Sequence, residues 1–308
     1  VMQKILNKYV QGNEPGCSIA YGNKQKTVFY SHGLADLKNK KQLTKYSRML
    51  TASISKQFTA HAAIKLAENK ILNLDSDITK VLPHFEKNYA VTARQLMNHR
   101  SGIPEHWSLF ELQGKSLNDH FSQKQAYQLA TQTNFLEFRP GDQFSYSNGG
   151  YTVLAQLIES VSGKSLNKNL KEITFDPINI SASFLIDEKQ DLTTLTKGYV
   201  KSVNGFLNIT PDSYIYGGGN LIINANELAT WAKYINKELI TNAYYIEGIK
   251  KSVSSNNYFA GLFIDKNNNA QPIIHHGGYY EHNSQDLTLL PETQEFALAL
   301  CNRSDFRP

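Results

Sequence analysis

The segment SISKQFTAHAAIKLAEN, residues 53–69, decides the fold. Its apolar side chains recur at helical spacing, so it predicts a helix that begins near Ser53. Side chains three positions apart share one helix face, which brings Lys56 within reach of Ser53. A serine hydroxyl is not ionised at neutral pH, and a partly desolvated lysine can take its proton. Ser55 is adjacent to Lys56 and points away from it, so the pattern favours Ser53 as the nucleophile and Lys56 as its partner.

Two short polar motifs downstream strengthen this interpretation. They are Tyr146-Ser147-Asn148 in the middle of the chain and His276-Gly277-Gly278 near its end. Tyr146 is predicted to act as the general base, or as a proton relay held by Lys56, because a phenol with a pKa near 10 needs cationic neighbours to be useful. Asn148 is predicted to orient the lysine and to donate to a substrate amide.

Each of these residues also has a purely structural interpretation. Ser53 suits a helix cap, and Lys56 could be a surface lysine. Tyr146 is one of 17 tyrosines and could belong to the core, while Asn148 before a glycine is typical of a turn. The occurrence of all three motifs in this order favours the catalytic interpretation over the structural one.

The ordered motifs resemble those of the penicillin-recognising serine enzymes, in the branch with Tyr-x-Asn and often His-x-Gly. That branch includes class C β-lactamases, DD-carboxypeptidases, D-amino-acid peptidases and related esterases. The resemblance runs from about residue 14 to residue 302. Further segments that carry it are Leu72-Asn73-Leu74-Asp75, Leu82-Pro83, residues 94–104, Pro140-Gly141-Asp142, residues 217–221 and Glu227-Leu228-Ala229.

The resemblance implies an α/β (α+β) fold. An antiparallel sheet built from both chain ends is flanked by helices and accompanied by a mostly helical inserted lobe. We expect one catalytic domain over residues 1–308, with a sheet lobe at about 1–60 and 221–308 and a helical lobe at about 61–220. Periodicity predicts strands at 17–21, 27–30, 259–265, 272–275, 285–290 and 295–301 and helices at 2–10, 53–69, 93–99, 123–131, 150–161 and 225–235.

The resemblance also implies roles for the C-terminal motif. His276 stands where lysine-bearing relatives bind a substrate carboxylate. Because histidine is mostly neutral at pH 7, we expect weaker carboxylate recognition here. Gly277 and Gly278 would allow close backbone approach. Tyr279 would supply an oxyanion N–H beside that of Ser53, although relatives often carry a small residue at this position.

The chain contains two cysteines, Cys17 and Cys301. In the resembled fold the first and last strands lie close together, so a disulfide is conceivable. We nevertheless expect two buried free thiols, because cysteine packs as a small hydrophobe. Sequence alone leaves the pairing open.

Composition excludes several classes of protein. The net charge is +5, but the lysines are scattered, and the denser run of Lys38, Lys40, Lys41 and Lys45 is typical of a solvated turn. We therefore expect no nucleic-acid partner. The chain lacks the metal-binding H-E-x-x-H motif, a phosphate-binding loop, a dinucleotide fingerprint and G-x-S-x-G, so we expect no metal and no cofactor.

Three substrate classes fit a serine acyl-transfer hydrolase of this kind: β-lactams, D-amino-acid peptides and simple esters. A non-turnover penicillin-binding or sensor domain is the alternative. Relatives act mainly outside the cytoplasm, so we expect a periplasmic or secreted protein whose leader is not part of this sequence. The resembled fold ends in a helix after the strand at 296–301, so we expect the natural chain to continue or to lack that helix. A membrane tether outside this sequence stays open.

Overall fold

The computed structural model describes residues 2–82, 85, 89–116, 119–132, 135–210, 212–252, 256–305 and 307–308. Pro83, which contributes to the resemblance, lies outside the described residues. None of the described helices is both long and apolar enough to cross a membrane.

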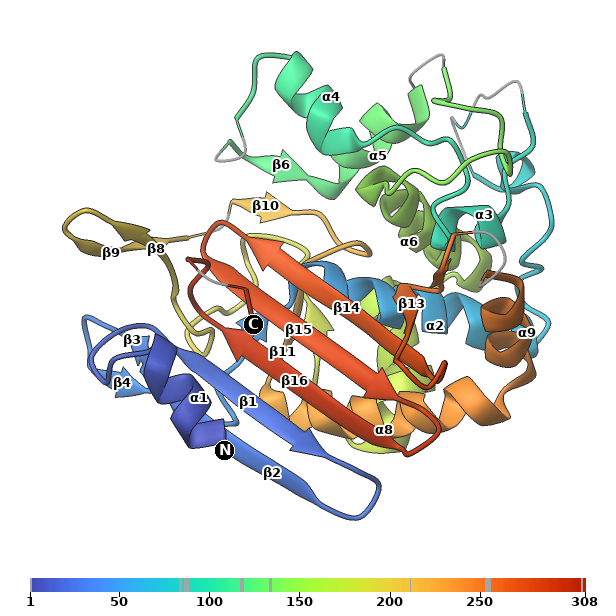
Figure 1. Cartoon of the computed structure of the whole chain (residues 1–308). Helices are drawn as coiled ribbons and strands as arrows, with labels where there is room; N and C mark the ends of the chain where they lie inside the picture. Colours follow the sequence, from blue (N-terminus) through green and yellow to red (C-terminus); the bar gives the residue numbers. More distant parts are fainter. Residues whose placement is uncertain are drawn as a thin grey trace.

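The centre of the molecule is an antiparallel sheet made from both ends of the chain (Figure 1). Its strands, in spatial order, are β12 (Tyr258–Phe259), β13 (Leu262–Lys266), β14 (Pro272–Tyr280), β15 (Asn283–Leu290), β16 (Glu295–Cys301), β1 (Cys17–Gly22) and β2 (Thr27–His32). The predicted sheet and fold class are therefore confirmed. The sequence also predicts one strand over 259–265, whereas the chain turns at Ala260 and Gly261, both of positive φ, and forms β12 and β13.

Helices cover both faces of this sheet and gather beside one end of it (Figure 1). They are α1 (Met2–Tyr9), α2 (Ser55–Glu68), α3 (Ala93–Met97), α4 (His106–Leu112), α5 (Gln123–Gln132), α6 (Asn148–Ser162), α7 (Leu166–Leu170), α8 (Ala225–Thr241) and α9 (Ala243–Ser252). Short single turns are η1 (Ala52–Ile54), η2 (Ile78–Lys80), η3 (Lys171–Phe175) and η4 (Asp176–Ile178).

Small strands complete the fold. They are β3 (Leu34–Asp36), β4 (Lys41–Gln42), β5 (Met49–Leu50), β6 (Phe121–Ser122), β7 (Ser183–Phe184), β8 (Gly198–Ser202), β9 (Gly205–Ile209), β10 (Ser213–Tyr214) and β11 (Leu221–Ile223). Strands β8 and β9 form a hairpin that projects from the body of the molecule (Figure 1).

The alternation of side chains along β16 explains why both faces of the sheet need a helix. Leu298 and Leu300 belong to the main core, into which α8 packs. Ala299 and Cys301 point the other way and form a second cluster with Leu6 of α1. The sheet is thus apolar on both sides at β16, which lies between β15 and β1.

Helix α2 is the central element of the main core. Every residue from Ser55 to Ala67 is buried except Lys65. Phe58 stacks on Trp231 of α8 with ring centroids 4.2 Å apart. Burial on all sides fixes the helix rigidly, so the residues at its N-terminal end have a defined position relative to the sheet.

Three of the predicted helices are capped by residues next to their ends. Thr92 and Gln95 form a capping box at the start of α3, and Asn224 and Glu227 form another at the start of α8. Gly163 ends α6 in the left-handed conformation. Each of these caps depends only on residues close together in the sequence, so the helix ends can be located without knowledge of the fold.

The prediction of two free thiols is wrong. Cys17 and Cys301 form a disulfide, and they face each other directly in the register of β1 and β16. Apolar packing is satisfied as well, because both residues are buried in the cluster beside α1. The bond joins β1 and β16, the sheet strands that come first and last in the sequence and lie next to each other in the sheet.

Candidate active site

Ser53 lies in the turn η1, immediately before α2, rather than inside the helix as the sequence predicts. Its neighbour Ala52 has a φ of 44°, a left-handed conformation that costs energy for a residue with a Cβ. Neither Thr51 nor Ile54 caps the helix through a side chain. The surrounding structure therefore holds Ser53 in a strained turn, partly exposed, at the mouth of a cavity.

Ser55, the competing serine, is not available for chemistry. Its side chain is fully buried, and its Oγ accepts a hydrogen bond from the Leu221 N–H at 3.1 Å and contacts Thr51 Oγ1 at 3.2 Å. It fastens the start of α2 to β11. Of the two serines, only Ser53 borders the cavity.

Lys56 is fully buried behind Ser53. Its Nζ lies 3.1 Å from Ser53 Oγ, 2.6 Å from Asn148 Oδ1 and 2.7 Å from the Gly218 carbonyl oxygen. It also lies 4.8 Å from the centre of the Tyr146 ring. The structure thus brings together the three residues predicted to be catalytic and the predicted orienting asparagine.

Burial lowers the pKa of Lys56 to about 7, while the charge of Glu105 acts in the opposite direction. A neutral amine has two N–H bonds and one lone pair. Asn148 and Gly218 provide the two nearer acceptors, which leaves the lone pair directed at the Ser53 hydroxyl. The geometry therefore suits Lys56 for accepting the serine proton at neutral pH.

The ring of Tyr146 packs among other aromatic side chains. Its ring lies 4.2 Å from that of His99 and 6.0 Å from that of His276, measured between centroids. Burial raises the pKa of Tyr146, and a hydrogen bond to Ser53 only partly opposes this. Tyr146 is therefore a neutral phenol at pH 7. That protonation state fits the predicted relay better than the predicted general base.

Strand β14 passes directly against the turn that carries Ser53. A Cβ on Gly278 would lie 2.4 Å from the Thr51 carbonyl oxygen and 3.2 Å from Ala52 Cβ. At Gly277 the nearest atom would be the Gln285 carbonyl oxygen at 3.6 Å, an ordinary contact. The predicted close approach thus requires a glycine at Gly278 and not at Gly277.

Tyr279 follows at the end of β14, half exposed on the cavity wall. Its side chain and that of Glu281 line the cavity without filling it. The role of its N–H as an oxyanion donor stays a prediction.

His276 differs from the expectation based on its sequence position. Its side chain is buried and does not line the cavity. Nδ1 lies 2.5 Å from the Gly277 carbonyl oxygen, and Nε2 lies 3.5 Å from the Tyr258 hydroxyl. Burial, with a smaller effect of the Lys56 charge, lowers the pKa of His276 to about 3. The imidazole is therefore neutral at every physiological pH, rather than titrating near 6.5, and it packs behind Tyr146.

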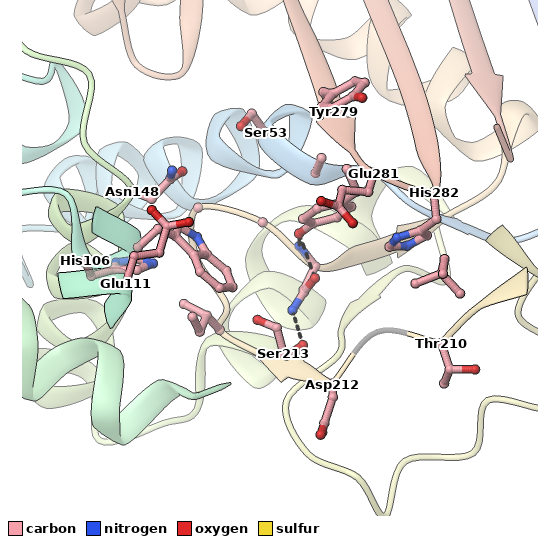
Figure 2. Close-up of a pocket in the computed structure, with 18 of the residues that line it drawn as sticks. Ser53, His106, Glu111, Asn148, Thr210, Asp212, Ser213, Tyr279, Glu281 and His282 are labelled. Atoms are coloured by element: carbon pink, nitrogen blue, oxygen red, sulfur yellow. Dashed lines mark hydrogen bonds between the residues drawn. The ribbon is translucent and has the colours of Figure 1, made fainter. Parts of the chain in front are cut away.

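The cavity has a volume of about 580 Å³ and extends from Ser53 between the helical part of the molecule and the end of β14 (Figure 2). Asn148, His106 and Glu111 lie on one wall, and Tyr279, Glu281 and His282 lie on another. The lining also includes Ala52, Trp107, Asn208, Ile209, Thr210, Asp212, Ser213, Ile215, Gly218, Gly219, Asn220 and Tyr280. Among the described residues, no three His, Cys, Asp or Glu side chains are grouped so as to hold a metal ion.

Sequence reasoning missed three contributors to this site. Gly218 supplies a carbonyl to Lys56. Glu105 caps α4 through Trp107 and accepts from the Asn148 N–H at 2.6 Å, so it joins the starts of α4 and α6 behind one wall of the cavity. His106 follows Glu105 on the cavity wall. The residues around 217–220 were part of the resemblance, but only the fold shows which atom faces the lysine.

The comparisons with known proteins agree with this geometry. The family model described as "Beta-lactamase" matches residues 2–307. A D-aminopeptidase from Brucella anthropi is 31% identical over 225 residues, which are 72% of this chain and 42% of that protein. The chain therefore spans less than half the length of this curated relative.

Solved structures share the fold. A penicillin-binding protein from Bacillus halodurans superposes with a TM-score of 0.81 at 21% identity, covering 94% of this chain and 91% of the other. The D-amino acid amidase from Ochrobactrum anthropi SV3, complexed with D-phenylalanine, superposes with a TM-score of 0.81 at 19% identity. The match covers 98% of this chain and 90% of the amidase chain. At these identities the likeness concerns the fold alone. The family match over almost the whole chain and the D-aminopeptidase relative together show that this chain belongs to the beta-lactamase family of serine hydrolases.

Proposed function

We propose that this chain hydrolyses amide bonds whose acyl group is a D-amino acid with a free amino group. The observation that carries the proposal is the charge of the cavity beside Ser53. Glu111, Asp212 and Glu281 line it, and no lysine or arginine does so among the described residues. A substrate with a protonated amine is favoured in such a site, and a carboxylate is repelled.

The other titratable groups of the lining do not offset this charge. Burial lowers the pKa of His106 and of His282 to about 4, so both are neutral at pH 7. Arg307 lies over the ring of Tyr279 at 5.1 Å from its centre, outside the lining. The cation that lysine-bearing relatives use for a substrate carboxylate is here replaced by the buried, neutral His276.

The D configuration rests on the relatives. One relative is named a D-aminopeptidase, and a structure of the same fold is a D-amino acid amidase complexed with D-phenylalanine. Both names describe a free amino group beside the bond that is cut. Charge and relatives therefore support the same substrate class.

The proposed reaction has two steps. Ser53 Oγ attacks the carbonyl carbon while its proton passes to neutral Lys56, and Tyr146 relays a proton to the departing amine as the C–N bond breaks. Water then attacks the resulting ester, its proton passes through Lys56 to Ser53 Oγ as the ester C–O bond breaks, and the free amino acid leaves with Ser53 restored. The backbone N–H groups of Ser53 and Tyr279 would hold the negative oxygen in both steps.

A substrate panel tests the proposal. We expect kcat/KM for D-alanine p-nitroanilide to exceed that for propionyl p-nitroanilide, which lacks only the amine, by at least about 10-fold, since an ion-paired amine contributes on the order of 2 kcal/mol. The L-alanine compound should be slower than the D compound. Faster hydrolysis of a penicillin than of the D-alanine substrate would contradict the proposal, and so would equal rates with and without the amine.

A further inference from the structure

Two buried histidines of the cavity lining have a ring nitrogen without a partner among the described residues, His282 through Nε2 and His106 through both nitrogens. His106 is 1% exposed, and neither ring nitrogen has a hydrogen-bond partner among the described residues. By contrast, both nitrogens of His61 contact tyrosine hydroxyls, at 2.9 and 3.3 Å. Both nitrogens of His99 are also occupied, by the Ser147 N–H and the Tyr258 hydroxyl.

Burying an imidazole without partners destabilises a fold, because each nitrogen loses its hydrogen bonds to water. The position could have carried an apolar residue, since the ring of His106 packs between those of Trp107 and Phe121, at 5.7 and 5.5 Å. The imidazole nevertheless lines the cavity that contains Ser53 and Asn148 (Figure 2). Each ring nitrogen exposes less than 1 Å² in this conformation, so a molecule in the cavity meets it when the ring turns out from between Trp107 and Phe121.

The chemistry of the surroundings indicates which kind of group binds there. Burial lowers the pKa of His106 to about 4 against the opposing charge of Glu105, so the ring is neutral at pH 7 and offers one lone pair and one N–H. Glu111, on the same helix and the same wall, adds a carboxylate. A lone pair beside a carboxylate suits a group that carries several N–H donors and a positive charge.

We propose that His106 is a substrate-binding residue that accepts a hydrogen bond from the ammonium group of the substrate's acyl residue. The inference rests on the proposed function and adds to it the atom that recognises the amine. In this arrangement Asn148 and His106 bind neighbouring parts of one acyl group from the same wall. His106 would then determine specificity without taking part in proton transfer at Ser53.

The test compares His106→Phe with wild type on the two anilides that differ only in the amine. Phenylalanine keeps the ring packing and removes both nitrogens, so the fold should keep or raise its Tm. For D-alanine p-nitroanilide we expect kcat/KM to fall about 10- to 100-fold, mainly through KM. For propionyl p-nitroanilide the change should stay within about threefold. Equal losses on both substrates would indicate a structural role and would overturn the proposal.

His106→Gln and His106→Asn provide the matched comparison. Each restores one amide oxygen as acceptor, near the position of Nε2 or of Nδ1 respectively, so one of them should recover at least part of the discrimination. If neither variant recovers any of the discrimination between the two anilides while both remain folded, the proposal that His106 accepts a hydrogen bond from the ammonium group is wrong.

A binding measurement separates this inference from the proposed reaction. In the Ser53→Ala protein, calorimetry should show tighter binding of D-alaninamide than of propionamide by at least about 10-fold. The preference should disappear when His106→Phe is added. Tighter binding of D-alaninamide than of propionamide, without hydrolysis of D-alanine p-nitroanilide by wild type, would support the inference about His106 and refute the proposed function. Absence of discrimination would overturn the inference, whatever the turnover.

Discussion

Replacing Lys56 by methionine is expected to lower kcat/KM by about 10³-fold or more, the upper range for loss of a general base. Methionine fills a similar volume but has no lone pair for the Ser53 proton. The measurement is steady-state hydrolysis of an uncharged ester, so that the substrate does not titrate over the same range. Circular dichroism and Tm would show that the fold is retained.

The pH dependence of wild type follows from the same residue. Burial lowers the pKa of Lys56 to about 7, and the base must be neutral to act. Activity should therefore be low at pH 5, rise through about pH 7 and level off above pH 8. The rising limb belongs to the lysine and should be absent from the residual activity of the methionine variant.

Lys65→Met is the matched control. It lies on the same helix but binds Glu68 and Glu238 at 3.0 Å, away from the cavity. Its loss should change stability slightly and leave kcat/KM within about threefold of wild type. If Lys56→Met kept more than about a tenth of the activity, Lys56 would not be the base.

The second large effect is expected at Gly278. In Gly278→Ala the added methyl group would lie 2.4 Å from the Thr51 carbonyl oxygen. Because this is a backbone atom, it can move away only if the turn around Ser53 moves with it. Strand β14 and this turn would have to separate, and the predicted oxyanion donors lie on both of them. We expect a loss of kcat of about 10²-fold or more, together with a lower Tm.

Gly277→Ala is the control for this variant, because the same methyl group one position earlier meets nothing closer than 3.6 Å. It should keep activity within about threefold and Tm within a few degrees. Equal behaviour of the two alanine variants would show that the close approach of β14 does not matter for catalysis. Wild-type activity in Gly278→Ala would show the same.

Much of this architecture was predictable because it depends on local pattern. The spacing of Ser53 and Lys56 requires only one helical turn, and the caps at Thr92 and Asn224 require only residues three positions apart. The sheet could be anticipated from strand-like segments at both ends of the chain together with the family resemblance.

Features that depend on register and burial could not be predicted in this way. The disulfide required Cys17 to lie opposite Cys301 in adjacent strands, and sequence does not give that register. The pKa of His276 is set by the aromatic cluster around it, which is assembled from distant segments. Sequence therefore could not show that its side chain is buried behind Tyr146, although its place on β14 beside the site was anticipated.

The cavity itself was also beyond sequence reasoning. The acceptor at Gly218, the link through Glu105 and the unpartnered ring of His106 each join elements far apart in the chain. No periodicity marks them. In the sequence, a glutamate followed by a histidine is typical of an ordinary helix start. Only the lack of hydrogen-bond partners in the structure distinguishes His106.

The most direct test of this account is the intact mass of the protein during reaction with an activated ester, p-nitrophenyl acetate. Wild type should gain one acetyl group, and peptide mapping should place it on Ser53. Ser53→Ala should gain none, whereas Ser55→Ala, whose serine is buried, should be acylated like wild type. An acetyl group on another residue, or equal acylation of Ser53→Ala, would contradict the assignment of Ser53 as the nucleophile.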